Sequence, residues 1–108
     1  MPIDLGSNDF HTEVNESSVP VLLDFWGPQC KPCIALNPTV AELENSYNGQ
    51  LKVVKINAPE HRQICIDLKV LGLPTFIVFQ NGEQVARLSR SMISDQELVD
   101  WVTENVPK

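Results

Sequence analysis

Two cysteines separated by two residues, Cys30-Lys31-Pro32-Cys33, are the strongest chemical signal in this 108-residue chain. Residues three apart on a helix lie within one turn on the same side, so the two sulfur atoms can meet. Cys30 follows a break at Gly27-Pro28-Gln29 and stands at an expected helix start, where free N–H groups and the helix dipole favour a thiolate. The pair predicts thiol–disulfide exchange, in which Cys30 attacks and Cys33 resolves the mixed disulfide.

The residues between the cysteines support this interpretation. Pro32 fits the first turn of a helix, where its missing N–H costs little, and Lys31 places a positive charge beside the thiolate. The alternative is a pair of structural cysteines that happen to stand three apart. Three cysteines are too few for a disulfide framework, and a position between a strand and a helix is one where reactive thiols occur.

The elements that must position the pair alternate between strands and helices. Apolar, β-favouring segments predict strands at residues 19–26, 51–56, 75–79 and, after the hairpin signal Asn81-Gly82, 83–88. Helices are expected at four places: from Ser7-Asn8-Asp9 to about residue 16, over 30–47, over 59–68, and from the capping box Ser94-Asp95-Gln96-Glu97 to residue 106. The pattern predicts an α/β fold with a central mixed β-sheet flanked by helices on both faces.

The helix expected over residues 30–47 contains Pro38, which predicts a kink because proline removes a backbone hydrogen bond and clashes with the preceding turn. Asn48-Gly49 is a typical helix end. The apolar residues of this helix recur at spacings that predict one inward face, formed by Ile34, Val40, Leu43 and Tyr47.

Composition narrows the class of protein. The net charge is −6 and the eight basic residues are scattered, which argues against a nucleic-acid partner. No apolar run approaches the length needed to cross a membrane, and the first residues lack the pattern of a signal peptide. We therefore expect one domain over residues 1–108 that is monomeric, cytoplasmic and not bound to membranes.

Residues 19–106 resemble thioredoxin. Asp24-Phe25-Trp26 followed by the C-x-x-C pair resembles the D-F-W…C-G-P-C segment of the family, and Pro38 matches its kink proline. Gly72-Leu73-Pro74-Thr75 resembles the G-I-P-T loop, and Asn81-Gly82-Glu83 the K-N-G-E hairpin. The resemblance implies the thioredoxin fold and reduction of protein disulfides with electrons from thioredoxin reductase, without a bound cofactor or metal.

The resemblance also implies roles for single residues. Asp24 would be a buried proton acceptor beneath Cys33, and burial in an apolar strand would raise its pKa toward neutrality. Lys55 would lie near that carboxylate. Pro74 would be a cis proline facing the disulfide, and Leu73 would offer backbone groups to an extended substrate. The alternatives are that Asp24 faces water at a strand end and that Lys55 lies on a solvated face.

Several positions depart from the family pattern. Lys31 stands where the family has glycine, and a cation beside Cys30 should make the protein more oxidising. Gln29 replaces a tryptophan, Ser91 replaces a loop glycine, and Ala58-Pro59 lacks an acidic residue. Substrate is expected to contact a surface formed by Trp26, Gln29, Lys31, Pro32, Leu73, Pro74 and Ser91.

The third cysteine, Cys65, has three interpretations: a small core residue, a regulatory thiol, or a zinc ligand together with His61, Cys30 and Cys33. Three classes of function also remain open. The first is a disulfide reductase. The second is a specialised oxidase, isomerase or dedicated electron donor to one partner, and the third is a binding scaffold that does not use its cysteines.

Overall fold

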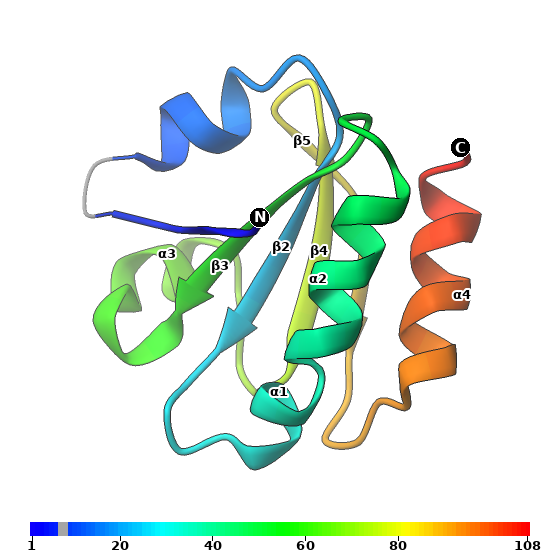
Figure 1. The fold of residues 1–108 in the computed structure, drawn as a ribbon. Coiled ribbons are helices and arrows are strands. Elements are labelled where there is room, and N and C mark those ends of the chain that lie inside the picture. Colours follow the sequence, from blue (N-terminus) through cyan, green and yellow to red (C-terminus); the bar gives the residue numbers. More distant parts are fainter. Residues whose placement is uncertain (7–8) are drawn as a thin grey trace.

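A mixed five-stranded sheet forms the centre of the computed structural model, which describes residues 1–6 and 9–108 (Figure 1). Its strands lie in the order β1-β3-β2-β4-β5. They are β1 (Ile3–Asp4), β2 (Val21–Trp26), β3 (Lys52–Asn57), β4 (Thr75–Gln80) and β5 (Glu83–Ser89). β1, β3 and β2 run parallel, whereas β4 is antiparallel to β2 and β5 to β4.

Two of the interior strands, β2 and β4, are covered on both faces. Their first five residues are buried in each case, which is the burial expected for continuous apolar runs. β5 is an edge strand and is largely exposed. The sequence did not predict β1, since two residues are too few to show a period; it forms by pairing Ile3 with Val54 and Asp4 with Lys55.

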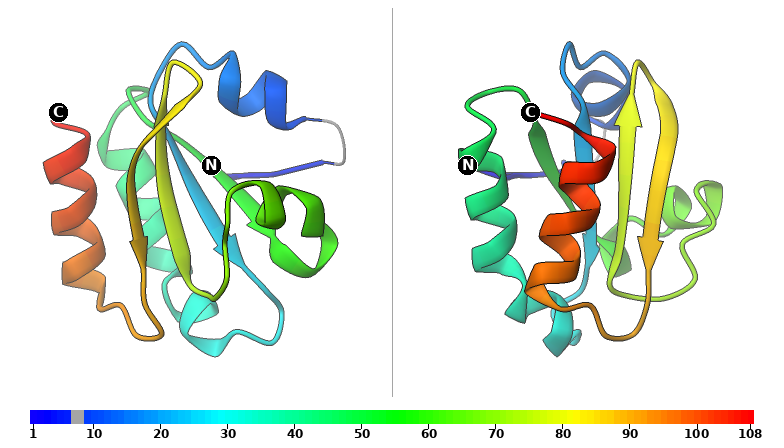
Figure 2. Two further views of the ribbon diagram at one scale, coloured as in Figure 1. Left: turned by 180° about the vertical axis from the view of Figure 1, so that it is seen from behind. Right: turned by 90° about the vertical axis from the view of Figure 1, so that its right-hand side faces the viewer.

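Helices cover both faces of the sheet (Figure 2). One face carries α2 (Asn37–Ser46) and α4 (Asp95–Asn105), and the other carries η1 (His11–Asn15), a π-helical turn, and α3 (Arg62–Asp67). Each face has its own apolar core. The first includes Leu22, Val40, Leu43, Phe76, Leu98 and Val102, and the second Val14, Leu23, Phe25, Val54, Ile56 and Ile77. The predicted α/β fold with helices on both faces is confirmed.

The helix that follows Cys30 is broken, as Pro38 predicts. Leu36 separates α1 (Lys31–Ala35) from α2 as the C-cap of the first helix and the N-cap of the second. Its N–H donates to the Cys33 carbonyl at 3.2 Å, one residue closer than in a regular α-helix. The break changes which side chains face inward. Leu36 is 3% exposed and belongs to the core, whereas Ile34 is 43% exposed. The predicted inward position of Ile34 is therefore wrong, because the expected face assumed a continuous helix.

Two other predicted helices differ in their bounds. The helix expected over residues 59–68 is divided into η2 (Ala58–Glu60) and α3, because His61 between them leaves the helical region with φ −134°. Ser7 and Asn8 of the first predicted helix start lie outside the described residues. The final helix begins as predicted, with the Ser94 side chain accepting the Glu97 N–H at 3.0 Å.

The predicted hairpin turn is also present. Asn81 and Gly82 both have positive φ, 54° and 78°, as the two-residue turn between antiparallel strands requires. Gly82 adopts this conformation without strain because it has no Cβ.

The break in the helix gives a stability prediction. Leu36→Ala should lower the free energy of unfolding by about 2–5 kcal/mol because it empties a core site, whereas Ile34→Ala should cost about 0.5 kcal/mol or less. Urea unfolding of both variants and the parent measures the difference. Equal costs at the two positions would contradict the inward orientation of Leu36.

Candidate active site

Cys30 and Cys33 are joined by a disulfide with an S–S distance of 2.09 Å and a Cα–Cα distance of 5.3 Å. Cys30 is the N-cap of α1, and its sulfur accepts the Cys33 N–H at 3.3 Å. Cys33 is 2% exposed, while Cys30 is only partly buried. The sulfur that a second protein can reach is therefore that of Cys30, and it already lies against a donor of the first helical turn.

The loop before Cys30 packs closely against the segment before β4. Gly27 is buried, and its carbonyl accepts the Cys30 N–H at 3.0 Å. A Cβ added to Gly27 would lie 3.4 Å from Cδ1 of Leu73 and 3.5 Å from Cδ of Pro59. These are ordinary van der Waals distances, so the disulfide loop lies next to Leu73 and Pro59 with room for no more than a small side chain at Gly27. Gln29, two residues on, is exposed.

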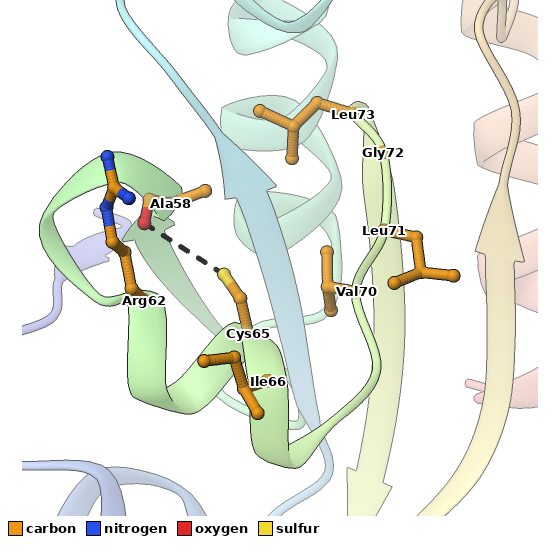
Figure 3. Close-up of a pocket in the computed structure, with 8 residues that line it drawn as sticks. All are labelled: Ala58, Arg62, Cys65, Ile66, Val70, Leu71, Gly72 and Leu73. Carbon is orange, nitrogen blue, oxygen red and sulfur yellow. Dashed lines mark hydrogen bonds between the residues drawn. The ribbon is translucent and has the colours of Figure 1, made fainter.

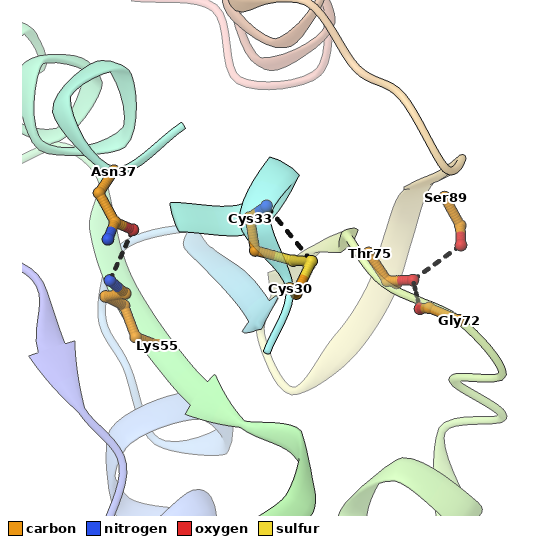
Figure 4. Close-up of a disulfide and its surroundings, with 7 residues drawn as sticks. All are labelled: Cys30, Cys33, Asn37, Lys55, Gly72, Thr75 and Ser89. Atoms are coloured by element: carbon orange, nitrogen blue, oxygen red, sulfur yellow. Dashed lines mark hydrogen bonds between the residues drawn. A yellow bond between two sulfur atoms is a disulfide. The ribbon is translucent and has the colours of Figure 1, made fainter. Parts of the chain in front are cut away.

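The Leu73-Pro74 peptide bond is cis, as the resemblance implied. The Thr75 hydroxyl, which is buried, donates to the Gly72 carbonyl at 2.6 Å and lies 2.7 Å from the Ser89 hydroxyl. These three residues lie on one side of the disulfide, whereas Lys55 lies on the other (Figure 4). The sequence singled out Thr75 only as part of a motif and did not reveal its bond to Ser89, fourteen residues away.

Asp24 lies within β2 and is 1% exposed, so the water-facing alternative is wrong. Both carboxylate oxygens are buried and have no hydrogen-bond partner among the described residues. Loss of hydration raises the pKa of Asp24 from 3.8 to about 7, and the positive charge of Lys55 partly opposes this increase. Asp24 can therefore gain or lose a proton near neutral pH.

Lys55 is the residue of β3 paired with Asp24. Its Nζ donates to Oδ1 of Asn37 at 2.8 Å (Figure 4). The same Nζ lies 5.0 Å from the centroid of the Trp26 ring, a cation–π contact. Lys55 is partly buried, so the solvated-face alternative is wrong. The sequence did not indicate Asn37, because the helix expected over residues 30–47 places it in the interior and its partner is 18 residues away.

The remaining predicted contact residues surround the disulfide loop at one end of the sheet. Lys31 is exposed and Pro32 partly buried at the start of α1. Ser91 is exposed in the segment between β5 and α4, which lies at the same end of the sheet as α1 (Figures 1 and 2). Trp26 ends β2, and its indole Nε1 is buried without a partner among the described residues.

Cys65 lies on α3, away from the disulfide, and packs against the core on that face. Its Sγ lies 4.0 Å from the Ala58 carbonyl oxygen, and burial raises the pKa of the thiol. A hollow of about 340 Å³ separates α3 from the segment before β4 (Figure 3). It is lined by Ala58, Arg62, Cys65, Ile66, Val70, Leu71, Gly72 and Leu73.

The zinc interpretation of Cys65 finds no support in the geometry. His61 donates through Nε2 to the Leu5 carbonyl at 3.1 Å, and the other two cysteines are bonded to each other. Within residues 1–6 and 9–108, no three His, Cys, Asp or Glu side chains come together as metal ligands.

Comparison with known proteins identifies a family whose members share sequence similarity with most of this chain. The chain matches the Thioredoxin family model over residues 2–104. It is 42% identical over 76 residues to Thioredoxin 1 of a Nostoc species, covering 70% of this chain and 71% of that protein. It is 37% identical over 87 residues to a thioredoxin of Acetoanaerobium sticklandii (81% and 83% covered) and 33% identical over 106 residues to a thioredoxin of Rickettsia felis (98% and 100% covered).

A Cys-x-x-Cys disulfide at a helix start, next to a mixed sheet, defines a thiol–disulfide oxidoreductase. The chain belongs to the thioredoxin family. The fold class, the family and the activity, reduction of protein disulfides, are thus as the sequence predicted.

The buried carboxyl gives a prediction on stability and pH. Because the pKa of Asp24 is about 7 in the folded protein and 3.8 in the unfolded chain, the folded protein binds more protons between these values, so stability falls as pH rises through that range. Asp24→Asn should therefore raise the free energy of unfolding at pH 8, by up to about 4 kcal/mol, and by much less at pH 4. Urea unfolding of the parent protein and the variant at pH 4 and pH 8 measures these free energies. An equal gain in stability at both pH values would contradict the raised pKa of Asp24.

Proposed function

We propose that this chain is a general protein-disulfide reductase that carries electrons from thioredoxin reductase to its substrates and so maintains thiols in the cytoplasm. In this proposal residues 1–108 act as one monomeric domain. The observation that carries it is the unequal exposure of the two sulfurs: Cys30 is accessible and Cys33 is 2% exposed. Among the described residues, no helix is long and apolar enough to cross a bilayer.

The reaction has two exchange steps. The Cys30 thiolate attacks one sulfur of a substrate disulfide, forming a mixed disulfide and releasing one substrate thiolate, which takes a proton from water. Cys33 then attacks the Cys30 sulfur, which releases the second substrate thiolate and leaves the Cys30–Cys33 disulfide. Two electrons have passed to the substrate, and reductase returns two electrons to restore the dithiol.

Asp24 is proposed to accept the proton of the Cys33 thiol in the second step. Its carboxyl is buried, and its pKa of about 7 is near the operating pH, which favours a general base. Lys55, paired with Asp24 across the two strands, is proposed to moderate the charge that forms there.

Substrate is proposed to bind across the end of the sheet that carries the disulfide. An extended segment would pair with the backbone of Leu73, next to Pro74, in the manner of an added strand. Trp26, Gln29, Lys31, Pro32 and Ser91 would form the surrounding surface. Gln29 and Lys31 are both exposed, which makes this surface polar beside Cys30.

Reduction of insulin disulfides tests the proposal. With NADPH and thioredoxin reductase, the chain should reduce insulin, Cys30→Ser should abolish activity, and the control Cys65→Ser should retain it because Cys65 lies on α3. Activity with dithiothreitol but not with reductase would favour a dedicated donor or another electron source. Activity that survives Cys30→Ser would contradict the dithiol mechanism.

The charge of Lys31 gives a second prediction. A cation beside Cys30 stabilises the thiolate and hence the reduced form, so Lys31→Gly should lower the reduction potential by up to about 30 mV. Lys69→Gly is a matched control, because Lys69 is exposed, lies just beyond α3 and already has a positive φ of 55°. Equilibration with glutathione measures the reduction potentials of the parent protein and both variants. An unchanged or higher potential in Lys31→Gly would contradict the effect assigned to the Lys31 charge.

A further inference from the structure

Asn37 connects the broken helix to the sheet. It is the first residue of α2, just before Pro38, and its side chain does not cap the helix. It is partly buried, and its Oδ1 accepts a hydrogen bond from Lys55 Nζ at 2.8 Å (Figure 4). A polar side chain at a helix start is thus used for a contact with β3.

Lys55 has several carboxylates around it. In the sheet it is paired with Asp4 of β1 on one side and with Asp24 of β2 on the other. Glu60 of η2 lines the same cavity, of about 250 Å³, as Lys55 and Asp4. No ion pair joins Lys55 to these three carboxylates, all of which lie in the described part of the chain. The ammonium binds the neutral amide of Asn37 instead.

We propose that Asn37 is a positioning residue that keeps the Lys55 ammonium out of an ion pair with Asp24. The amide oxygen accepts a hydrogen bond without adding charge, so it directs the ammonium toward the start of α2 and the face of Trp26. The functional consequence rests on the proposed role of Asp24 as proton acceptor, whereas the electrostatic effect does not.

The reason for such an arrangement is the balance of effects on Asp24. Burial alone raises the pKa of the carboxyl, and the charge of Lys55 lowers it. A direct ion pair lowers a carboxyl pKa by about 1–3. Asp24 would then stay ionised at neutral pH and would be a weaker base. The other strand partner of Asp24, Phe76 of β4, is apolar and adds no charge.

Three substitutions at Asn37 separate this role from a structural one. Asn37→Leu is similar in size but accepts no hydrogen bond, and Asn37→Ala removes the acceptor without adding bulk. Both should lower the titration midpoint of Asp24 by about one pH unit, because Lys55 turns to the carboxylate. Asn37→Asp keeps an acceptor and adds a negative charge, so it should raise the midpoint.

The measurement is a pH titration of the Asp24 carboxyl carbon by ¹³C NMR in the oxidised protein, in which Cys30 and Cys33 cannot titrate. In a Lys55→Met background, Asn37→Leu should leave the midpoint unchanged, since the effect requires the ammonium. An unchanged midpoint in the Leu and Ala variants would overturn the proposal. A higher midpoint would also overturn it, because the ammonium would then have moved to Asp4 or Glu60.

The rate of insulin reduction against pH tests the functional part separately. The acidic limb of this pH–rate profile should shift in each variant by the same amount as the titration midpoint of Asp24 measured by NMR. A shifted midpoint with an unshifted rate profile would confirm the positioning by Asn37 and contradict the role of Asp24 as the proton acceptor.

Discussion

The parallel pairing of β2 with β3 is the constraint on which the site depends. Its register places Lys55 beside Asp24 and Asn57 beside Trp26, with both pairs on one face of the sheet. A slip of one residue would turn one partner of each pair to the opposite face, since side chains alternate along a strand. Such a slip is disfavoured because it would turn Asp24 or Lys55 toward the apolar core on the opposite face of the sheet. The charge balance near the disulfide is therefore maintained by hydrophobic packing.

That packing also offsets the cost of the site. A carboxyl without a hydrogen-bond partner in the middle of a central strand lowers stability at neutral pH, because its charged form loses hydration. Two apolar cores, one on each face of the sheet, compensate. Pro38 adds a second local cost by breaking the helix, yet the break brings Leu36 into the core. Both unfavourable features lie within or next to the elements that carry the reacting sulfurs.

Much of this arrangement is visible in local patterns. The continuous apolar runs of β2 and β4, the Asn81-Gly82 turn and the break at Pro38 each follow from the residues in one short segment, because backbone preference and burial period act over few residues. The same holds for Cys30 and Cys33, whose spacing within one turn is itself the chemical signal. The resemblance to thioredoxin added the cis bond before Pro74, which a single sequence does not reveal, since most such bonds are trans.

The sequence by itself determined the reaction class, the main strands and helices, and the position of the redox pair, since these depend on residue type and short spacing. Only the tertiary structure decided that β1 joins the sheet, that Leu36 rather than Ile34 faces inward, and that Asn37 binds Lys55. These features depend on strand register and on the orientation of α2 after the helix break at Leu36. Contacts between residues far apart in the chain set both of these, and no local propensity encodes them.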